Sequence, residues 1–263
     1  MKRRALLALT GTAMAGVAGC LGGSSPTGPM NDDDLPTDTQ PADGIPPTFE
    51  QTPESQVVDP AGFDTVTVEG IDVPLAPIDV VYYWYARGDA RFVDARGPSQ
   101  YRQSHIYGAV LSPAPRGFPE DDPVDQWPKS DRIVCYCGCP HHLSSLRGAV
   151  LLANDYQDVY VIDEGFWEWH ERGYPMAGGD IQARPSVEVI DGVADPGFAG
   201  QSAWATHPAS GQMEATAIQA DGSYELHLRF ADVSPDSVIE VETPGYTVRA
   251  PLSELTTTVV TGL

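Results

Sequence analysis

Lysine is nearly absent from this chain, which has 263 residues and only two lysines, Lys2 and Lys129. Lysine and arginine together number 15, against 37 aspartate and glutamate residues, and the formal net charge is -22. A field this negative repels the phosphates of nucleic acids, which binding proteins neutralise with clustered positive charge. We therefore expect no nucleic-acid partner.

Two other shortages limit the fold. Charged residues make up only 20% of the chain, and the 26 glycines and 24 prolines show no Gly-X-Y period. These features exclude a coiled coil and collagen and predict many turns. After residue 20, no apolar run is long enough to cross a bilayer. Hydrophobic residues still reach 41%, which is enough for the core of one large or two ordinary domains.

The scarcity of lysine beside many acids resembles the surfaces of proteins from extreme halophiles. In molar salt the Debye length falls to about 3 Å, so carboxylates repel one another only weakly. We expect a protein that requires salt for its stability.

The N-terminus predicts an export signal. Three basic residues at 2–4 precede an apolar stretch at 5–18 that is too short to span a membrane. The paired arginines resemble a twin-arginine signal, and Val17-Ala18-Gly19-Cys20 resembles a lipobox whose cysteine is lipid-modified. We expect residues 1–20 to be a signal peptide with a lipobox, and Cys20 to anchor the protein in the lipid bilayer on the extracellular side of the cell membrane. Residues 21–62, rich in Gly, Ser, Thr, Pro and Asp, predict a disordered linker.

Strand-like and helix-like patterns alternate over residues 63–178. The helices are expected at residues 78–87, 146–152 and 166–169, and the strands at 91–94, 132–137 and 159–162. This alternation predicts an α/β domain with a parallel sheet flanked by helices. Ligands of such sheets bind at the carboxyl ends of the strands.

Motifs in this region resemble the rhodanese domain family. Phe92-Val93-Asp94-Ala95-Arg96, followed by His105-Ile106-Tyr107-Gly108-Ala109-Val110, is similar to the family's opening signature. Ile133-Val134-Cys135-Tyr136-Cys137 resembles the strand that delivers its active-site cysteine. Asp163-Glu164-Gly165-Phe166-Trp167-Glu168-Trp169 with Gly173-Tyr174-Pro175 resembles its closing motif. The resemblance implies a rhodanese-like fold for residues 63–178.

The resemblance also implies a sulfurtransferase, in which a cysteine thiolate accepts a sulfane sulfur as a persulfide and passes it to a nucleophile. It assigns this catalytic role to Cys137. The next eight residues would form a cradle, whose backbone N–H groups and helix N-terminus lower the pKa of the thiol. The cradle residues are Gly138, Cys139, Pro140, His141, His142, Leu143, Ser144 and Ser145. The implied partners are a small sulfur donor and a thiol or cyanide-like acceptor, and no cofactor is expected.

Three residues are expected to support the site, Asp94 and Arg96 as a structural ion pair and His105 by fixing a turn. The family's loop commonly carries arginine, whereas here the first arginine after the cysteine is Arg147, inside the helix. A loop arginine binds oxyanions, so its absence argues against thiosulfate as the donor and against the related dual-specificity phosphatases. Histidine can replace it, as a cation or as the base that deprotonates Cys137.

Two alternatives remain open for the same loop. Cys137, Cys139, His141 and His142 offer thiolate and imidazole ligands for copper or zinc. Their spacing matches no standard zinc module, so we expect no stoichiometric metal. The loop could instead belong to a non-catalytic module that binds a partner without turnover. Cys135 is expected to be a buried structural thiol.

The remaining residues, 181–263, predict a small β-sandwich. The clearest alternation of apolar and polar residues lies at 224–230, after the turn Asp221-Gly222-Ser223. Further strands are expected at 238–242, 246–249 and 255–260. Short pieces, among them Ala203-Trp204-Ala205-Thr206 and Thr243-Pro244-Gly245-Tyr246, resemble the transthyretin-like domains attached to carboxypeptidases. This resemblance implies a spacer or an interaction module that binds a protein partner.

Overall fold

The computed structural model describes residues 43–262. The predicted signal peptide, Cys20 and the predicted linker as far as residue 42 lie outside the described residues. Within residues 43–262, no helix combines the length and the apolar character needed to cross a membrane.

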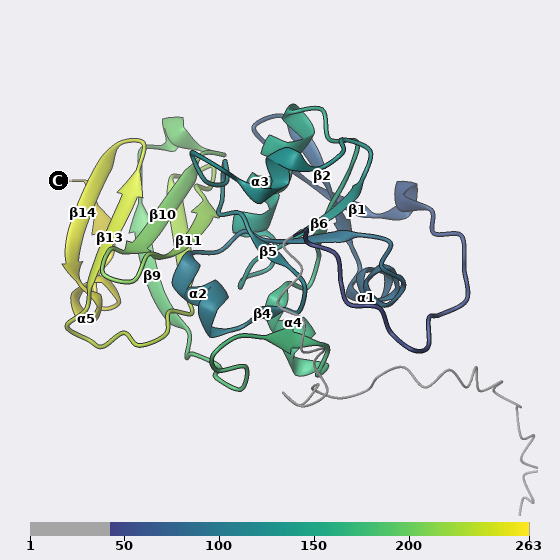
Figure 1. Cartoon of the computed structure of the whole chain (residues 1–263). Helices are drawn as coiled ribbons and strands as arrows, with labels where there is room; N and C mark the ends of the chain where they lie inside the picture. Colours follow the sequence, from purple (N-terminus) through teal and green to yellow (C-terminus); the bar gives the residue numbers. More distant parts are fainter. Residues whose placement is uncertain (1–42, 263) are drawn as a thin grey trace, which may run out of the picture.

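A six-stranded sheet forms the centre of the first region, with the strand order β1-β2-β7-β6-β3-β5 (Figure 1). Its strands are β1 Asp64–Val68, β2 Ile71–Ala76, β3 Arg91–Asp94, β5 Val110–Leu111, β6 Arg132–Tyr136 and β7 Asp158–Ile162. The helices of this region are α1 Ile78–Arg87, α2 Pro98–Gln103, α3 His142–Ala153 and α4 Phe166–Glu171, with the 3-10 helices η1 Pro60–Gly62 and η2 Pro123–Gln126. Two short strands, β4 His105–Ile106 and β8 Met176–Ala177, pair separately.

The α/β prediction is confirmed, but the sheet is mixed. Strand β1 is antiparallel to β2, whereas the other neighbouring strands are parallel. The β1–β2 hairpin closes through Glu69 and Gly70, both at positive φ (50° and 83°), as a two-residue turn of this kind requires. The β1–β2 hairpin was not predicted from the sequence.

Side chains that alternate along each strand bury both faces of the sheet. On β6, Val134 and Tyr136 lie in the core with residues of α1 and α4, whereas Ile133 and Cys135 lie in the core with residues of α3. Figure 1 accordingly shows α3 on one side of the sheet and α1 and α4 on the other. Strands buried on both faces need nearly continuous apolar sequence, which explains why this region can be read from its apolar runs.

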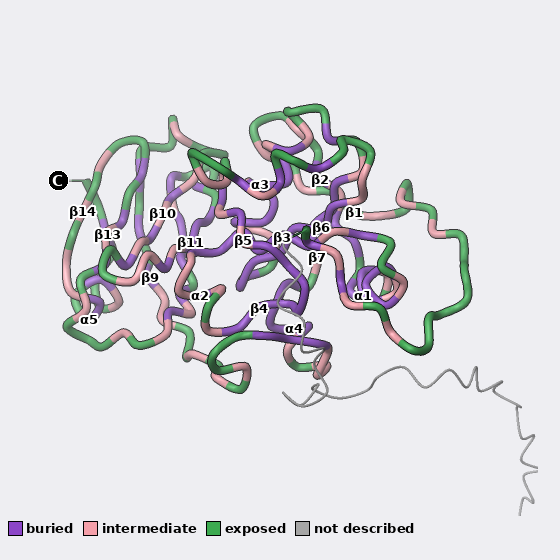
Figure 2. Tube along the Cα trace, viewed as in Figure 1, coloured by how far each residue is buried: buried purple, intermediate pink, exposed green. Residues whose placement is uncertain are grey.

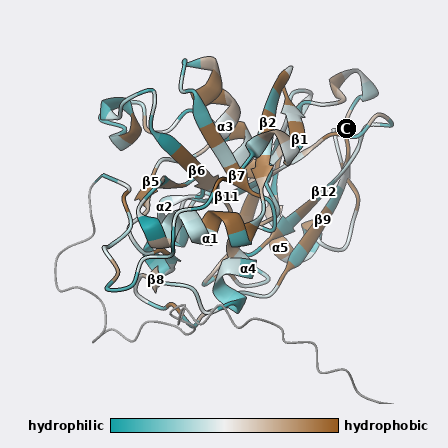
Figure 3. Ribbon diagram, turned by 90° about the vertical axis from the view of Figure 1, so that its right-hand side faces the viewer, coloured by the Kyte–Doolittle hydropathy of each residue, from teal (hydrophilic) through white to brown (hydrophobic). Residues whose placement is uncertain are grey.

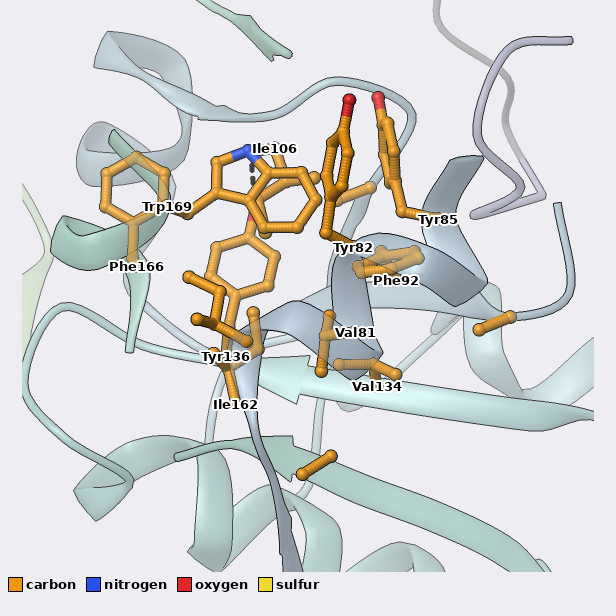
Figure 4. Close-up of a cluster of buried hydrophobic side chains, with 14 of the residues drawn as sticks. Val81, Tyr82, Tyr85, Phe92, Ile106, Val134, Tyr136, Ile162, Phe166 and Trp169 are labelled. Atoms are coloured by element: carbon orange, nitrogen blue, oxygen red, sulfur yellow. Dashed lines mark hydrogen bonds between the residues drawn. The ribbon is translucent and has the colours of Figure 1, made fainter. Parts of the chain in front are cut away.

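Aromatic rings fill the core beneath α1 and α4 (Figure 4). Trp169, which is fully buried, contacts Tyr85 edge to face at a centroid distance of 4.9 Å, and its Nε1 donates to Pro175 O at 3.0 Å. Tyr85 also meets Phe92 at 5.2 Å. The closing motif therefore holds α4 against the sheet.

Residues 43–62 differ from the disordered linker expected there, because they lie against the first region. Gly44 O accepts a hydrogen bond from Phe92 N at 2.8 Å, and the ring of Phe49 is 5.6 Å from that of Tyr85. At Gly44 (φ 75°) a Cβ atom would lie 2.7 Å from Trp127, so the close approach requires glycine. A few apolar side chains are enough to attach a segment whose average composition is polar.

The second region consists mainly of antiparallel strands in two sheets, with the orders β11-β10-β13-β14 and β12-β9-β15. Its elements are β9 Glu188–Val193, η3 Pro196–Phe198, β10 Ser202–His207, β11 Gln212–Ala217, β12 Ser223–Leu228, β13 Val238–Thr243, β14 Tyr246–Pro251, α5 Leu252–Leu255 and β15 Val260–Thr261. Residues of both sheets share one apolar cluster, including Ile190 and Leu226 from one sheet and Ala203 and Val241 from the other. Apolar segments (brown) alternate with polar ones along β9 and β12 in Figure 3.

Three of the four strands expected in this region are confirmed, and the fourth is wrong. Leu255 is the last residue of the short helix α5, residues 256–259 form no strand, and only Val260–Thr261 pairs as β15. Leu252 and Leu255 are both buried, at the spacing of three that one helical turn places on the same face. The threonines after them bond back to the carbonyls of this turn, which stabilises it.

Candidate active site at the end of strand β6

The loop after β6 places Cys137 at the carboxyl edge of the parallel strands. Its side chain is fully buried, and Sγ donates to Cys139 O at 3.0 Å and lies 3.3 Å from Ser144 Oγ. The backbone N–H groups of Leu143 and Ser144, in the first turn of α3, lower the pKa of this thiol. Of the eight cradle residues expected from the sequence, Leu143 and Ser144 thus place donors near the Cys137 sulfur.

Strand β11 of the second region covers this loop. Ala215 lies in one buried cluster with Cys137 and Leu143, and β11 packs against both α2 and α3. Met213 N donates to Gln100 Oε1 at 3.2 Å across the junction. Figure 2 shows buried backbone extending from the six-stranded sheet toward β11. Solvent therefore does not reach the Cys137 sulfur in this arrangement.

The pKa of Cys137 is shifted in the direction opposite to the expected one. Burial, and after it the nearby Glu214 carboxylate, raise the pKa of the Cys137 thiol to about 12, against the lowering effect of the Ser144 and Leu143 donors. The expectation of a lowered pKa was wrong because the loop sequence shows the donors but not the strand that covers them.

Glu214 is the site residue that the sequence analysis missed. Its Oε1 accepts from Ala215 N at 3.0 Å, and its Oε2 accepts from Cys139 Sγ at 3.3 Å. Burial raises the pKa of Glu214 to about 7. Burial and the Glu214 charge both raise the pKa of Cys139, whose Sγ also lies 3.2 Å from His227 O. The sequence gives only a weak signal for Glu214, because this acidic residue lies among the small side chains of a strand that was not predicted.

The two cradle histidines lie in different surroundings. His142, the first residue of α3, has a ring nitrogen within 4.8 Å of Cys139 Sγ and of a Glu214 carboxylate oxygen. His141 precedes it with φ 46°, and its Nε2 lies 3.7 Å from Asp163 Oδ1. Burial lowers the pKa of His141, and it lowers the pKa of His142 to about 4, so both rings are neutral near pH 7. Neither supplies the cation that the sequence analysis considered.

The supporting residues lie on the floor of the loop. Arg96 Nη2 is 2.7 Å from Asp94 Oδ2 and 2.6 Å from Ser104 O, with both side chains of the ion pair buried. His105 stacks on Tyr101, and its Nδ1 is 2.7 Å from Tyr101 O. The pair and the stack fix the segment between β3 and β4.

Arg147 does not reach the cradle. Its guanidinium bonds Ser112 Oγ at 2.9 Å and Asp122 Oδ1 at 3.2 Å, and it is buried there. Because Arg96 is paired as well, neither of these guanidinium groups is free to hold an oxyanion in the loop.

The remaining cysteine, Cys135, faces the α3 side of the sheet, in an apolar cluster. Burial raises the pKa of this thiol to about 12. Among residues 43–262, all three cysteines are free thiols. The inert surroundings of Cys135 are those of a structural thiol.

A solvent-accessible cavity of about 650 Å³ opens beside the loop, on the side of Cys139. Its lining includes Cys139, His142 and Thr216, together with Glu225 and His227 from β12. This cavity gives a small ligand one approach to the site.

Comparison with known proteins identifies the first region. The family model of the rhodanese-like domain matches residues 79–172. One similar solved structure is the rhodanese-like domain of an Anabaena protein, with 23% identity over 43% of this chain and 85% of that chain and a TM-score of 0.36. A thiosulfate sulfurtransferase from Pseudomonas aeruginosa has 23% identity over 33% of this chain and 16% of that chain, with a TM-score of 0.29. A rhodanese from E. coli with anions has 25% identity over 34% of this chain and 96% of that chain, with a TM-score of 0.28. The match to the rhodanese-like domain thus covers residues 79–172 of the first region.

Proposed function

We propose that this rhodanese-like domain transfers sulfane sulfur through a persulfide on Cys137. The observation that carries the proposal is the position of its sulfur, at the end of β6 and facing the N–H groups of Leu143 and Ser144 and the hydroxyl of Ser144. Donors at the start of a helix stabilise a thiolate or a persulfide anion.

Two displacements complete the transfer. The Cys137 thiolate attacks the outer sulfur of a small hydropersulfide, RS–SH; a new S–S bond forms, the donor's S–S bond breaks, and RS⁻ leaves. An acceptor thiolate then attacks the outer sulfur of the Cys137 persulfide, takes it as a new hydropersulfide, and restores the Cys137 thiolate. No external oxidant or reductant is needed, because a sulfur atom is transferred at a constant oxidation level.

The charges around the loop favour a thiol-derived donor over thiosulfate. A dianion would enter beside Glu214, while the guanidinium groups of Arg96 and Arg147 are engaged with Asp94 and Asp122. Oxyanion binding in a buried site requires unpaired donors of positive charge. We therefore propose hydropersulfides of small thiols as the donor class.

The arrangement with β11 over Cys137 is the resting form in this proposal. Burial is the largest cause of the raised thiol pKa, so movement of β11 away from the loop lowers the pKa while the helix donors remain. Transfer then requires an opening at the junction of the two regions.

A sulfur-transfer assay tests the proposal. With a small hydropersulfide as donor and a thiol as acceptor, Cys137→Ser abolishes transfer and Cys139→Ser reduces it only partly. Cys135→Ala, on the α3 face of the sheet, serves as the matched control and retains transfer. Undiminished transfer by the Cys137→Ser protein would overturn the assignment.

The second candidate is a partner-binding rhodanese-like module without turnover. It is favoured by the complete burial of Cys137 and by the pKa of its thiol, about 12. A wild-type protein that transfers no sulfur from hydropersulfides or from thiosulfate would establish this candidate over the enzyme.

We also propose that the protein is exported and anchored to the outer face of the cell membrane through Cys20. Three features of the N-terminus support this location: the basic residues at 2–4, the short apolar stretch after them, and the ending Val17-Ala18-Gly19-Cys20. Replacement of Cys20 by Ala is expected to release the protein into the medium or leave it unprocessed. Membrane retention of a processed Cys20→Ala protein would refute the lipid anchor.

For the second region we propose the role of an interaction module, in line with its resemblance to transthyretin-like domains. Its contact with α2 and α3 through β11 supports a first role in covering its own rhodanese-like domain.

A further inference from the structure

Three potential metal ligands meet where the two regions touch, just outside Cys137. Cys139 lies in the cradle, His142 begins α3, and Glu214 comes from β11. Cys139 Sγ, a ring nitrogen of His142 and a carboxylate oxygen of Glu214 all lie within 4.8 Å of one another. Cys139 and Glu214 are buried, and both Cys139 and His142 line the cavity of about 650 Å³.

We propose that Cys139, His142 and Glu214 bind one divalent transition-metal ion, best matched by Zn²⁺, with a fourth position open to this cavity. Thiolate, imidazole and carboxylate are the three kinds of side chain that bind zinc in proteins. Three protein ligands with one open position are typical of zinc sites that take an exchangeable water or substrate. Co²⁺, whose complexes absorb visible light, can occupy the same ligand set as a spectroscopic probe.

The separations suit a tetrahedral ion. Zinc–ligand bonds of about 2.0–2.3 Å place ligand atoms about 3.5 Å apart. Cys139 Sγ and Glu214 Oε2 are already 3.3 Å apart. The His142 ring nitrogen lies within 4.8 Å of the other two ligand atoms. It therefore has to move closer by about 1 Å, which rotation of the side chain can supply.

The charges balance as well. One thiolate and one carboxylate offset a divalent cation while His142 stays neutral, so the buried site has no net charge. Without a cation, two buried anionic groups in contact oppose each other's ionisation, and here the thiol of Cys139 donates to Glu214 instead.

The His142 ring is available for a metal. A ring nitrogen of His142 lies beside Cys139 Sγ and a Glu214 carboxylate oxygen, whereas the His141 ring faces Asp163. This ligand set differs from the one considered from the sequence, because it omits Cys137 and His141 and adds Glu214. An ion bound here would tie the cradle to β11 and hold the cover over Cys137.

The test is a titration of chelator-treated protein with Zn²⁺ alone, followed by calorimetry, with Co²⁺ as a spectroscopic probe. The wild type is expected to bind one equivalent, and its Co²⁺ form to show thiolate-to-metal charge-transfer absorption. Loss of a group that only hydrogen-bonds a metal ligand weakens metal binding about 10–100-fold. Because His142 and Glu214 are proposed as ligands themselves, His142→Gln and Glu214→Gln should weaken binding by at least about 100-fold. The Cys139→Ser protein should lose the charge-transfer absorption.

Two variants serve as matched controls. His141→Gln alters the adjacent histidine and should bind Zn²⁺ as the wild type does, and Cys137→Ser should also retain binding. Metal binding by Cys137→Ser separates this inference from the proposed sulfur transfer, since either can fail alone. Circular dichroism of each metal-free variant establishes that it is folded, and the near-isosteric Glu214→Gln keeps the test valid if a loop variant does not fold.

The inference is overturned if the wild type binds no Zn²⁺ stoichiometrically. It is equally overturned if His141→Gln and His142→Gln weaken binding alike, or if folded Glu214→Gln retains wild-type affinity.

Discussion

The two regions of the molecule differ in whether they bury ion pairs. The rhodanese-like region buries Arg96–Asp94 and Arg147–Asp122, whose side chains are at most 3% exposed, although other pairs such as Arg172–Asp79 lie at its surface. The second region places a comparable pair, Arg249–Glu240, at its surface, with side chains 64% and 22% exposed. Buried charge fixes the geometry beneath the loop, whereas the second region contributes a covering strand. The proposed sulfur transfer would therefore depend on the first region for its chemistry and on the second region for access.

The largest effect is expected when one partner is removed from each of the pairs Arg96–Asp94 and Arg249–Glu240. Asp94→Ala leaves the Arg96 guanidinium buried without its counterion, which should lower the free energy of unfolding by about 3–5 kcal/mol. Glu240→Ala removes the matched surface partner and should change it by about 0–1 kcal/mol. Denaturant unfolding at constant pH and salt measures both values. Equal losses in the two variants would contradict the contrast between the regions.

A smaller effect is expected at the junction. Ala215→Glu places a carboxylate against Cys137 and Leu143, and its desolvation should loosen β11 from the loop. A loosening of about 1.4 kcal/mol corresponds to a tenfold higher rate of Cys137 alkylation at fixed pH.

The control for this change lies on the same strand. Ala217 is exposed, so Ala217→Glu should leave the alkylation rate of Cys137 unchanged. Fragment-ion mass spectrometry separates Cys137 from the two neighbouring cysteines. If Ala215→Glu folds and labels at the wild-type rate, β11 is not the barrier to Cys137.

The smallest effect concerns the acidic surface of both regions. Lowering the salt concentration from molar to about 0.1 M lengthens the Debye length to about 10 Å and strengthens repulsion among carboxylates. The melting temperature should therefore fall, by about 2–4 °C for each kcal/mol of stability lost. Scanning calorimetry at the two salt concentrations checks this, and identical melting temperatures would refute the salt requirement.

Much of the first region could be predicted from the sequence, because its motifs are contiguous and its interior strands are apolar runs. Helix α1 and strand β3 begin and end where the pattern placed them, at Ile78–Arg87 and Arg91–Asp94. The order of strand, loop and helix around Cys137 could also be predicted, since the three segments follow one another in the sequence.

What could not be predicted depends on contacts between distant segments. Glu214 meets Cys139 across 75 positions of sequence, on a strand whose small side chains give little periodic signal. The direction of the Cys137 pKa shift was wrong for the same reason, because it is set by the covering strand. The strand expected at 255–260 was wrong because Leu255 ends the helix α5, whose helical spacing of Leu252 and Leu255 extends over only four residues.

The proposed persulfide on Cys137 is tested most directly by locating the transferred sulfur. Wild-type protein is incubated with a small hydropersulfide, trapped with an alkylating reagent, and its cysteine peptide is fragmented in the mass spectrometer. Transfer through the cradle predicts the extra sulfur on Cys137, with none on Cys135. Sulfur found on Cys139 alone, or on no cysteine while the donor remains intact, would contradict sulfur transfer through Cys137.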